Sequence, residues 1–287
     1  LGTVARFEDL EVTGTTELPE FGGAALAVQE GASLEVERAA VRDNEGTGVY
    51  AALEGATLSL TDVEIASTLP GETMRDGRGL VVADGASATL SRVTFLDNHG
   101  LSVLADIAQS LSMGNVLVRD TACTTHDSRF GRGLHVEGGG DISVVHGQFL
   151  GSHDVSVAAF GDGTSLVLEQ VLISESLERS CVDLEEDDPN HCLAGRGYGL
   201  GSYDGATVTV SDVEIRDSAG AGLQLADGGT VTGHDLRIHG CSIAVNLQDL
   251  PNDYDWESAV ADLLVEGCET ELDRTDMSVP EELPERE

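Results

Sequence analysis

The stretch Thr57-Leu58-Ser59-Leu60-Thr61-Asp62-Val63-Glu64-Ile65 contains the unit from which most of this chain is built. Its apolar residues follow the order apolar-x-apolar-x-x-apolar-x-apolar, so two alternating runs meet at a polar turn. The unit recurs with its first apolar position at Ala5, Leu34, Leu58, Ala88, Leu111, Ile142, Leu166, Val208, Val231 and, degraded, Ser258. This alternation predicts β-strands and argues against helical repeats, whose apolar residues would recur about every 3.6 positions.

A third short segment, led by Gly or another small residue, separates successive copies, as in Gly79-Leu80-Val81-Val82 and Gly222-Leu223-Gln224-Leu225. Strands this short cannot bury a face alone, but stacked periods pair each strand with its copies and enclose one core. We therefore expect an all-β fold, a single right-handed parallel β-helix solenoid of about ten three-strand rungs. It would cover residues 1–272 with a cap at about 250–272, and residues 273–287 would form an acidic Pro/Glu tail or linker.

The longer insertions all enter at one corner of alternate rungs, at residues 68–76, 124–132 and 178–198. Loops that leave alternate rungs at one corner lie about two strand spacings apart, roughly 10 Å. We expect a groove along this edge.

The charge balance excludes several partners. The chain has 15 basic residues, all of them Arg, against 52 acidic residues, a net charge of −37. Such a chain repels nucleic acids and anionic membranes. No apolar run is long enough to span a bilayer. We expect a monomer or part of a longer chain, and the missing initiating Met favours a part of a longer chain.

The five cysteines are not spaced as a zinc site would require. Stacking places Cys241 and Cys268 at equivalent positions of neighbouring rungs, within the range for a disulfide. Cys181 and Cys192 flank the longest insertion and would close it as a loop, which leaves Cys123 over. These pairs would indicate an exported protein, since disulfides persist in oxidising compartments. The alternative is five buried free thiols.

The repeats resemble the right-handed parallel β-helix, pectate-lyase-like superfamily, most closely from Gly199-Leu200-Gly201 through Ile243-Ala244-Val245-Asn246 to Leu272-Asp273. More narrowly, they are similar to repeat-rich exported proteins of myxobacteria and their relatives. The resemblance implies the fold but no chemistry. Fragments similar to hydrolase motifs, such as Asp187-Asp188 and Gly233-His234-Asp235, lack their companions, and the chain has no Lys to serve a lyase.

The candidate ligand residues lie in or beside the edge loops. They are Arg75, Arg78, His126, Arg129, Arg132, Arg179, His191 and Arg196. With neighbouring carboxylates they could hold an anionic glycan through bidentate Arg contacts, or house an acid–base pair. Alternatively, these charges pair with one another at the surface and contribute little.

Two further surfaces follow from the stacking. The polar turns form a column whose first four residues, Asp9, Arg38, Asp62 and Arg92, alternate in sign and can pair between rungs. The last three copies place Asp212, Asp235 and Asp262 above one another, where Ca²⁺ or solvent would have to offset the repulsion. Ser and Thr alternate on one outer face, as at Thr57, Ser59, Ser87, Thr89, Ser110, Ser112, Thr207, Thr209, Thr230 and Thr232. This array resembles the ice-binding face of antifreeze β-helices, but Glu35, Asp141 and Val167 interrupt it.

Our leading hypothesis from these patterns is a non-catalytic, exported β-helix scaffold that binds carbohydrate or divalent cations at its loop edge. It requires no cofactor, although Ca²⁺ would fit the stacked carboxylates, and its expected partner is an extracellular or surface polysaccharide. The rival is a polysaccharide lyase, hydrolase or epimerase, which predicts an Arg or His bonded to a carboxylate within an open groove. Ice binding is a third hypothesis.

Overall fold

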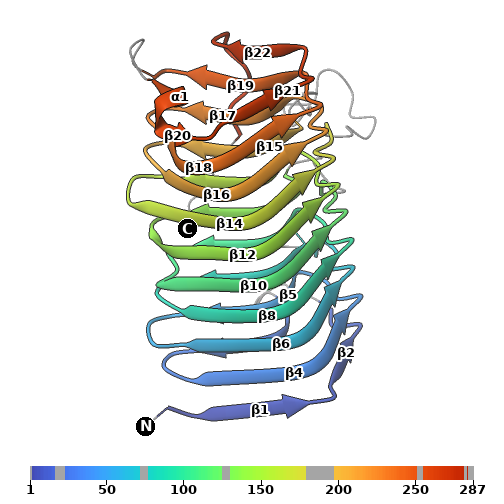
Figure 1. Ribbon diagram of the computed structural model, residues 1–287. Coiled ribbons are helices and arrows are strands. Elements are labelled where there is room, and N and C mark those ends of the chain that lie inside the picture. The colour runs from blue at the N-terminus through green and yellow to red at the C-terminus, as the bar shows by residue number, and fades with distance from the viewer. Residues whose placement is uncertain are drawn as a thin grey trace, which may run out of the picture.

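Two parallel sheets wind around a common core in the computed structural model, which describes residues 2–16, 23–71, 77–124, 130–178, 197–250, 255–280 and Leu283. Figure 1 shows the strands stacked along one axis, from β1 at one end to β22 at the other. The predicted all-β parallel solenoid is confirmed.

The two sheets differ in strand length. The twelve-stranded sheet contains β1 (Val4–Glu8), β2 (Glu11–Thr13), β4 (Ser33–Arg42), β6 (Thr57–Ala66), β8 (Ser87–Leu96), β10 (Ser110–Arg119), β12 (Gly140–Leu150), β14 (Thr164–Ser174), β16 (Thr207–Arg216), β18 (Thr230–His239), β20 (Val260–Ala261) and β21 (Leu264–Glu266). The ten-stranded sheet contains β3 (Ala24–Gln29), β5 (Thr47–Ala52), β7 (Arg78–Ala83), β9 (Leu101–Asp106), β11 (Arg132–Glu137), β13 (Val155–Phe160), β15 (Tyr198–Tyr203), β17 (Ala221–Ala226), β19 (Ile243–Gln248) and β22 (Thr270–Asp273).

The repeat unit forms one bent strand where two strands were predicted. In β6 the chain bends at Asp62, whose φ of 56° lies in the left-handed region, and the strand continues beyond it. The equivalent residues Asp9, Arg38, Arg92, Asn115, His146, Gln170, Asp212, Asp235 and Asp262 also have positive φ. Asp and Asn adopt this conformation more readily than most residues, which explains their frequency at the bend. The unit is split in two at the ends of the stack, as β1 with β2 and β20 with β21.

Register in both sheets is strictly in phase, so each inward position forms a column of apolar side chains. Leu34 of β4 pairs with Leu58 of β6, which pairs in turn with Ala88 of β8. Inward residues of both sheets form one continuous buried core. The core is open at the N-terminal end, where Phe7 stands at an inward position in line with Val36 but is 43% exposed. At the other end, Trp256 of α1 (Trp256–Ala259) is buried against the last turn.

Polar ladders run along the corners of the solenoid. The opposite charges expected at the strand bends pair between turns: Arg38 Nε donates to Asp9 Oδ1 at 2.8 Å, and Arg92 Nε to Asp62 Oδ1 at 2.6 Å. After the long strands, an internal ladder is buried. There the amide of Thr68 donates to Asn98 Oδ1 at 3.1 Å. These bonds satisfy backbone groups where the chain turns from one sheet to the other.

Candidate functional site

The outward faces of the two sheets have opposite character. On the twelve-stranded sheet, outward side chains are largely Ser, Thr and charged residues. On the ten-stranded sheet, by contrast, Val81, Leu104, Phe160 and Tyr203 point outward and are buried. Because side chains alternate between the faces of a strand, these residues cannot belong to the inner core. The outer face of the ten-stranded sheet therefore carries a second buried layer.

Aromatic and amide side chains form a strip along this outer face, from β11 to β19. His135 stacks on Phe160 with ring centroids 4.9 Å apart, and Phe160 stacks on Tyr203 at 4.6 Å. Tyr203 Oη donates to Gln224 Oε1 at 2.9 Å, and Gln224 Nε2 donates to Asn246 Oδ1 at 3.2 Å. The five residues come from five successive strands, so the strip follows the solenoid axis. We call His135, Phe160, Tyr203, Gln224 and Asn246 the axial strip.

An ion network adjoins one end of the axial strip. Arg132 Nε donates to Asp154 Oδ2 at 2.9 Å, and neither side chain is exposed. The Arg132 guanidinium also lies over the rings of Phe130 and Phe160, 5.0 and 5.3 Å from their centroids. A buried charge requires such pairing, because desolvation would otherwise make it very costly.

His135 links the Arg132 guanidinium to Glu137. Arg132 Nη1 and His135 Nδ1 are 2.7 Å apart, and His135 Nε2 and Glu137 Oε2 are 2.8 Å apart. A guanidinium can only donate hydrogen bonds, so His135 Nδ1 accepts one from Arg132 Nη1. His135 Nε2 therefore carries the ring proton and donates a hydrogen bond to Glu137 Oε2. Burial, with the nearby Arg132 charge, lowers the pKa of His135. Burial is the largest single influence on Glu137 and opposes its ionisation. The interactions with His135, the Leu283 amide and the Arg132 charge together outweigh burial, so the pKa of Glu137 is lowered.

The chain's own C-terminal segment lies on this outer face. We call residues 274–280 together with Leu283 the C-terminal strap. Tyr198 Oη donates to the carbonyl of Ser278 at 3.0 Å, and the amide of Leu283 donates to Glu137 Oε2 at 3.3 Å. Met277 and Val279 pack against the cluster that contains Phe160 and Tyr203. The sequence predicted a tail or linker here, whereas the described residues of this segment contact the solenoid.

Of the predicted loop-edge residues, the structure describes Arg78 and Arg132. Both align with Leu101 of β9, so they stand two strands apart, as expected for insertions on alternate turns. Arg132 differs from the expected open rim because its side chain is fully buried against Asp154. The other candidates lie outside the described residues: Arg75, His126, Arg129, Arg179, His191 and Arg196.

The predicted calcium ligands occupy equivalent bends of successive turns. Asp212, Asp235 and Asp262 have φ values of 54°, 54° and 53°. Within the part of the chain that the structure describes, no three His, Cys, Asp or Glu side chains are grouped to hold a metal ion. A calcium site at these residues stays a prediction from the sequence.

Cys241 and Cys268 lie on neighbouring turns, as the repeat alignment requires, with their sulfur atoms 2.7 Å apart as two thiols. Cys123 is buried with its Sγ 3.3 Å from the Phe130 carbonyl. Cys181 and Cys192 lie outside the described residues. The disulfides therefore stay predictions, and the structure supplies the proximity for one of them.

The hydroxyl face is aligned but interrupted. Thr57 Oγ1 donates to Ser33 Oγ at 2.7 Å, and Thr230 Oγ1 to Thr207 Oγ1 at 3.3 Å, along one column of the twelve-stranded sheet. Asp141 stands in this same column. A carboxylate within the array breaks the uniform hydroxyl lattice that ice binding would need, so we do not pursue this hypothesis.

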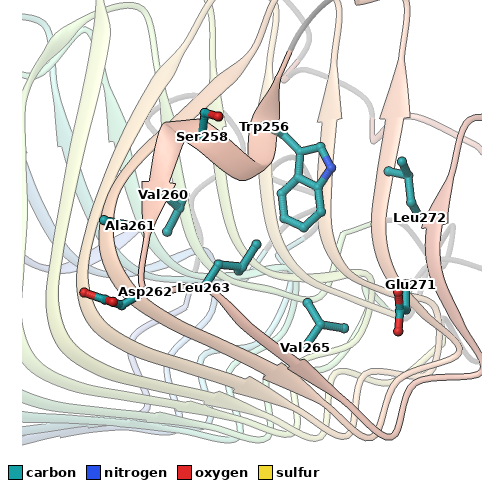
Figure 2. A pocket seen from close by; sticks show the side chains of 9 residues that line it. All are labelled: Trp256, Ser258, Val260, Ala261, Asp262, Leu263, Val265, Glu271 and Leu272. Atoms are coloured by element: carbon teal, nitrogen blue, oxygen red, sulfur yellow. The ribbon is translucent and has the colours of Figure 1, made fainter.

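A pocket of about 690 Å³ opens at the C-terminal end of the solenoid. Figure 2 shows Trp256 above Leu263 and Val265, with Leu272 on the opposite wall. Its ionisable lining residues are Asp262 and Glu271. The pocket thus lies at the C-terminal end of the solenoid, whereas the axial strip lies on the outer face of the ten-stranded sheet.

Sequence reasoning missed Asp154, Glu137 and the axial strip. The third segment of each period contained the signal, because its outward positions read Tyr50, Val81, Leu104 and His135 on four successive turns. A solvent-facing sheet would place polar residues there. These residues therefore indicate a covered face, although not what covers it.

Comparison with known proteins agrees with this architecture. The structure is similar to the crystal structure of pectate lyase Pel9A, with a TM-score of 0.57 and 12% sequence identity, over 95% of this chain and 69% of that one. At this identity the likeness shows the fold alone. No curated protein matches the sequence. Among the described helices, none is long and apolar enough to cross a bilayer.

The family model described as "Right handed beta helix region" matches residues 78–246, more than half of the chain. The chain therefore belongs to the right-handed β-helix family.

Proposed function

We propose that this protein is a non-catalytic, exported β-helix module that binds an extracellular polysaccharide along the outer face of its ten-stranded sheet. The axial strip is the observation that carries the proposal. Aromatic faces pack against the C–H groups of sugar rings, and amide groups hydrogen-bond to sugar hydroxyls, so a strip combining both suits a glycan. Its course along the solenoid axis suits a linear polymer.

The ion network supports binding without cleavage. A general acid or base must reach the substrate with a proton to give or a site to accept one. Here Arg132 is hydrogen-bonded to Asp154 and His135, and His135 is also hydrogen-bonded to Glu137. These groups therefore bind one another rather than a substrate. Arg132, Asp154 and the residues of the axial strip are all buried, so a polysaccharide can reach this face only when its covering opens. In this role the network holds the edge of the strip in place.

The charge of the protein favours a neutral polysaccharide. A net charge of −37 repels polyanions, and this repulsion weakens as salt screens it. We therefore expect a neutral glucan or xylan to bind more tightly than polygalacturonate at low salt.

The second candidate is a polysaccharide-active enzyme. It is favoured by one observation, namely that Arg132 and His135 each lie within hydrogen-bonding distance of a carboxylate, as an acid–base site requires. It would require the buried network to become exposed to substrate.

One experiment separates the two candidates. Binding of soluble glucan, xylan, alginate and polygalacturonate is measured by calorimetry, and the same mixtures are assayed for new reducing ends and unsaturated uronates, with and without Ca²⁺. We expect binding without product. Product formation would establish the enzyme, and the absence of any binding would overturn the proposed function.

A matched pair of variants locates the binding site. Gln224→Ala removes an amide from the axial strip and should weaken glycan affinity about tenfold, the value of one or two hydrogen bonds. Gln109→Ala, at an exposed turn, should leave the affinity unchanged. Equal affinities for the two variants would place binding elsewhere on the protein.

A further inference from the structure

We infer that the C-terminal strap is a reversible internal competitor, which occupies the polysaccharide face and is displaced when the polymer binds. This inference rests on the proposed function, because it concerns the same face. It adds a form of regulation: the affinity of the protein for its ligand is set by its own C-terminal residues.

The path of the strap coincides with that of the axial strip. The backbone carbonyl of Thr275 accepts from Asn246 of β19, that of Ser278 accepts from Tyr198 of β15, and the amide of Leu283 donates to Glu137 of β11. From β19 to β11 the strap crosses four strand spacings, about 19 Å. Eight residues in extended conformation reach about 27 Å, so contacts spread over about 19 Å along the solenoid axis lie within the reach of this segment. An extended polymer on this face would follow the same line.

The strap uses groups that a glycan would also use. The Asn246 amide belongs to the axial strip, and Tyr198 Oη is a donor at its side. Met277 and Val279 pack on the cluster that includes Phe160 and Tyr203, where sugar rings would stack. Strap and polymer therefore cannot occupy these positions together.

The strap is held differently from the strands beneath it. These three hydrogen bonds join strap backbone to side chains, whereas neighbouring turns of the solenoid are joined by backbone ladders. Met277, Ser278 and Val279 are only partly buried. A partly buried segment can open while the rest of the fold remains intact.

Charge also favours release of the strap. Residues 274–287 contain two arginines and five acidic residues, a net charge of −3, within a chain of net charge −37. Self-repulsion between like-charged parts of a protein opposes compact packing, and it increases as the salt concentration falls.

The test compares the full-length wild type with the double variant Met277→Ser, Val279→Ser, which weakens strap packing without changing charge. The control is Val4→Ser, Val167→Ser, which removes two exposed valines outside the strap. Affinity is measured for soluble neutral glucan and xylan, and folding is checked by circular dichroism. In parallel, hydrogen exchange of the amides of residues 274–283 is measured in the wild type with and without saturating polysaccharide.

We expect the strap variant to bind about tenfold more tightly than the wild type and the control, since less of it is in the closed, non-binding state. In the wild type, bound polysaccharide should accelerate exchange in the strap. If the variant does not fold, the wild-type exchange measurement decides the question alone.

The failures of the two proposals are distinguishable. Polysaccharide binding with equal affinity in variant and wild type, and with unchanged strap exchange, would overturn the competitor and leave the proposed function standing. If no protein binds any polysaccharide, both proposals are overturned.

Discussion

The guanidinium of Arg132 bonds the carboxylate of Asp154 across 2.9 Å, with both side chains completely shielded from solvent. Arg132 begins β11, and Asp154 precedes β13 on the next turn. The pair thus ties two turns together beneath the second buried layer.

Removing one member of this pair should strongly destabilise the protein. We expect Arg132→Met to lower the free energy of unfolding by about 3–5 kcal/mol, because Asp154 is left buried without its partner. Combining it with Asp154→Asn should cost less than the sum of the two single changes. Urea denaturation followed by circular dichroism measures this. Arg92→Ala, which breaks the exposed pair with Asp62, should leave the denaturation midpoint unchanged. An equally small effect at Arg132 would contradict a buried ion pair.

Acid should loosen the ion network. The pKa of His135 is lowered from its ordinary 6.5 by burial, and the pKa of Glu137 lies below its ordinary 4.5. The unfolded chain therefore binds more protons at these residues than the folded protein. Stability should be full above pH 6.5, begin to fall as the pH drops through 6.5, and fall further below 4.5. Urea midpoints across this range test the sign.

The matched control for this pH dependence is the exposed His234. The variant His135→Gln should lose the part of the decline that begins at 6.5, while His234→Gln should retain it. A wild-type protein that became more stable on acidification would contradict the network described here.

Oxidation should join Cys241 to Cys268. Burial raises the pKa of the Cys241 thiol, so little thiolate is present and the bond should form slowly. Once formed, it would close a loop of 27 residues and stabilise the protein by about 3.5 kcal/mol on the chain-entropy estimate. The variant Cys268→Ser should therefore lose stability relative to wild type under oxidising conditions, but much less under reduction. Peptide mapping after alkylation would identify the pair; an unreacted Cys268 after oxidation would count against it.

The ring of Tyr203 lies against Gly201 of the same strand, and a Cβ at position 201 would collide with this ring. We expect Gly201→Ala to displace Tyr203, break its hydrogen bond to Gln224 and weaken glycan binding more than it weakens the fold. Near-ultraviolet circular dichroism and calorimetry report the two effects. Unchanged affinity with a displaced ring would remove Tyr203 from the binding face.

Trp256 closes the C-terminal end of the core. Trp256→Ala should lower the free energy of unfolding by about 3–5 kcal/mol, as for other large buried side chains. Hydrogen-exchange protection should fall more in β18 and β19 than in β4 and β6, since each turn is stabilised chiefly by its neighbours. Leu264→Ala, at a residue that is 44% exposed, is the control. Uniform loss of protection along the solenoid would contradict end capping.

The solenoid can be predicted from the repeat alone. Because parallel, in-register stacking repeats the same environment on every turn, each apolar column can be read directly from the repeat, as for Leu34, Leu58 and Ala88. The same logic predicted the pairing of Arg38 with Asp9 and the proximity of Cys241 to Cys268. These contacts join equivalent positions on adjacent turns, so a period and a register are enough to find them.

The covering of the ten-stranded sheet cannot be predicted in this way. Tyr198 and Ser278 are 80 residues apart, and Glu137 and Leu283 are 146 residues apart, with no period relating them. The position of the strap depends on side chains presented by several distant turns, which no repeat within the strap can indicate. Arg132 illustrates the consequence: its sequence context suggests an exposed loop edge, but burial beside Asp154 under a second layer makes it part of the interior.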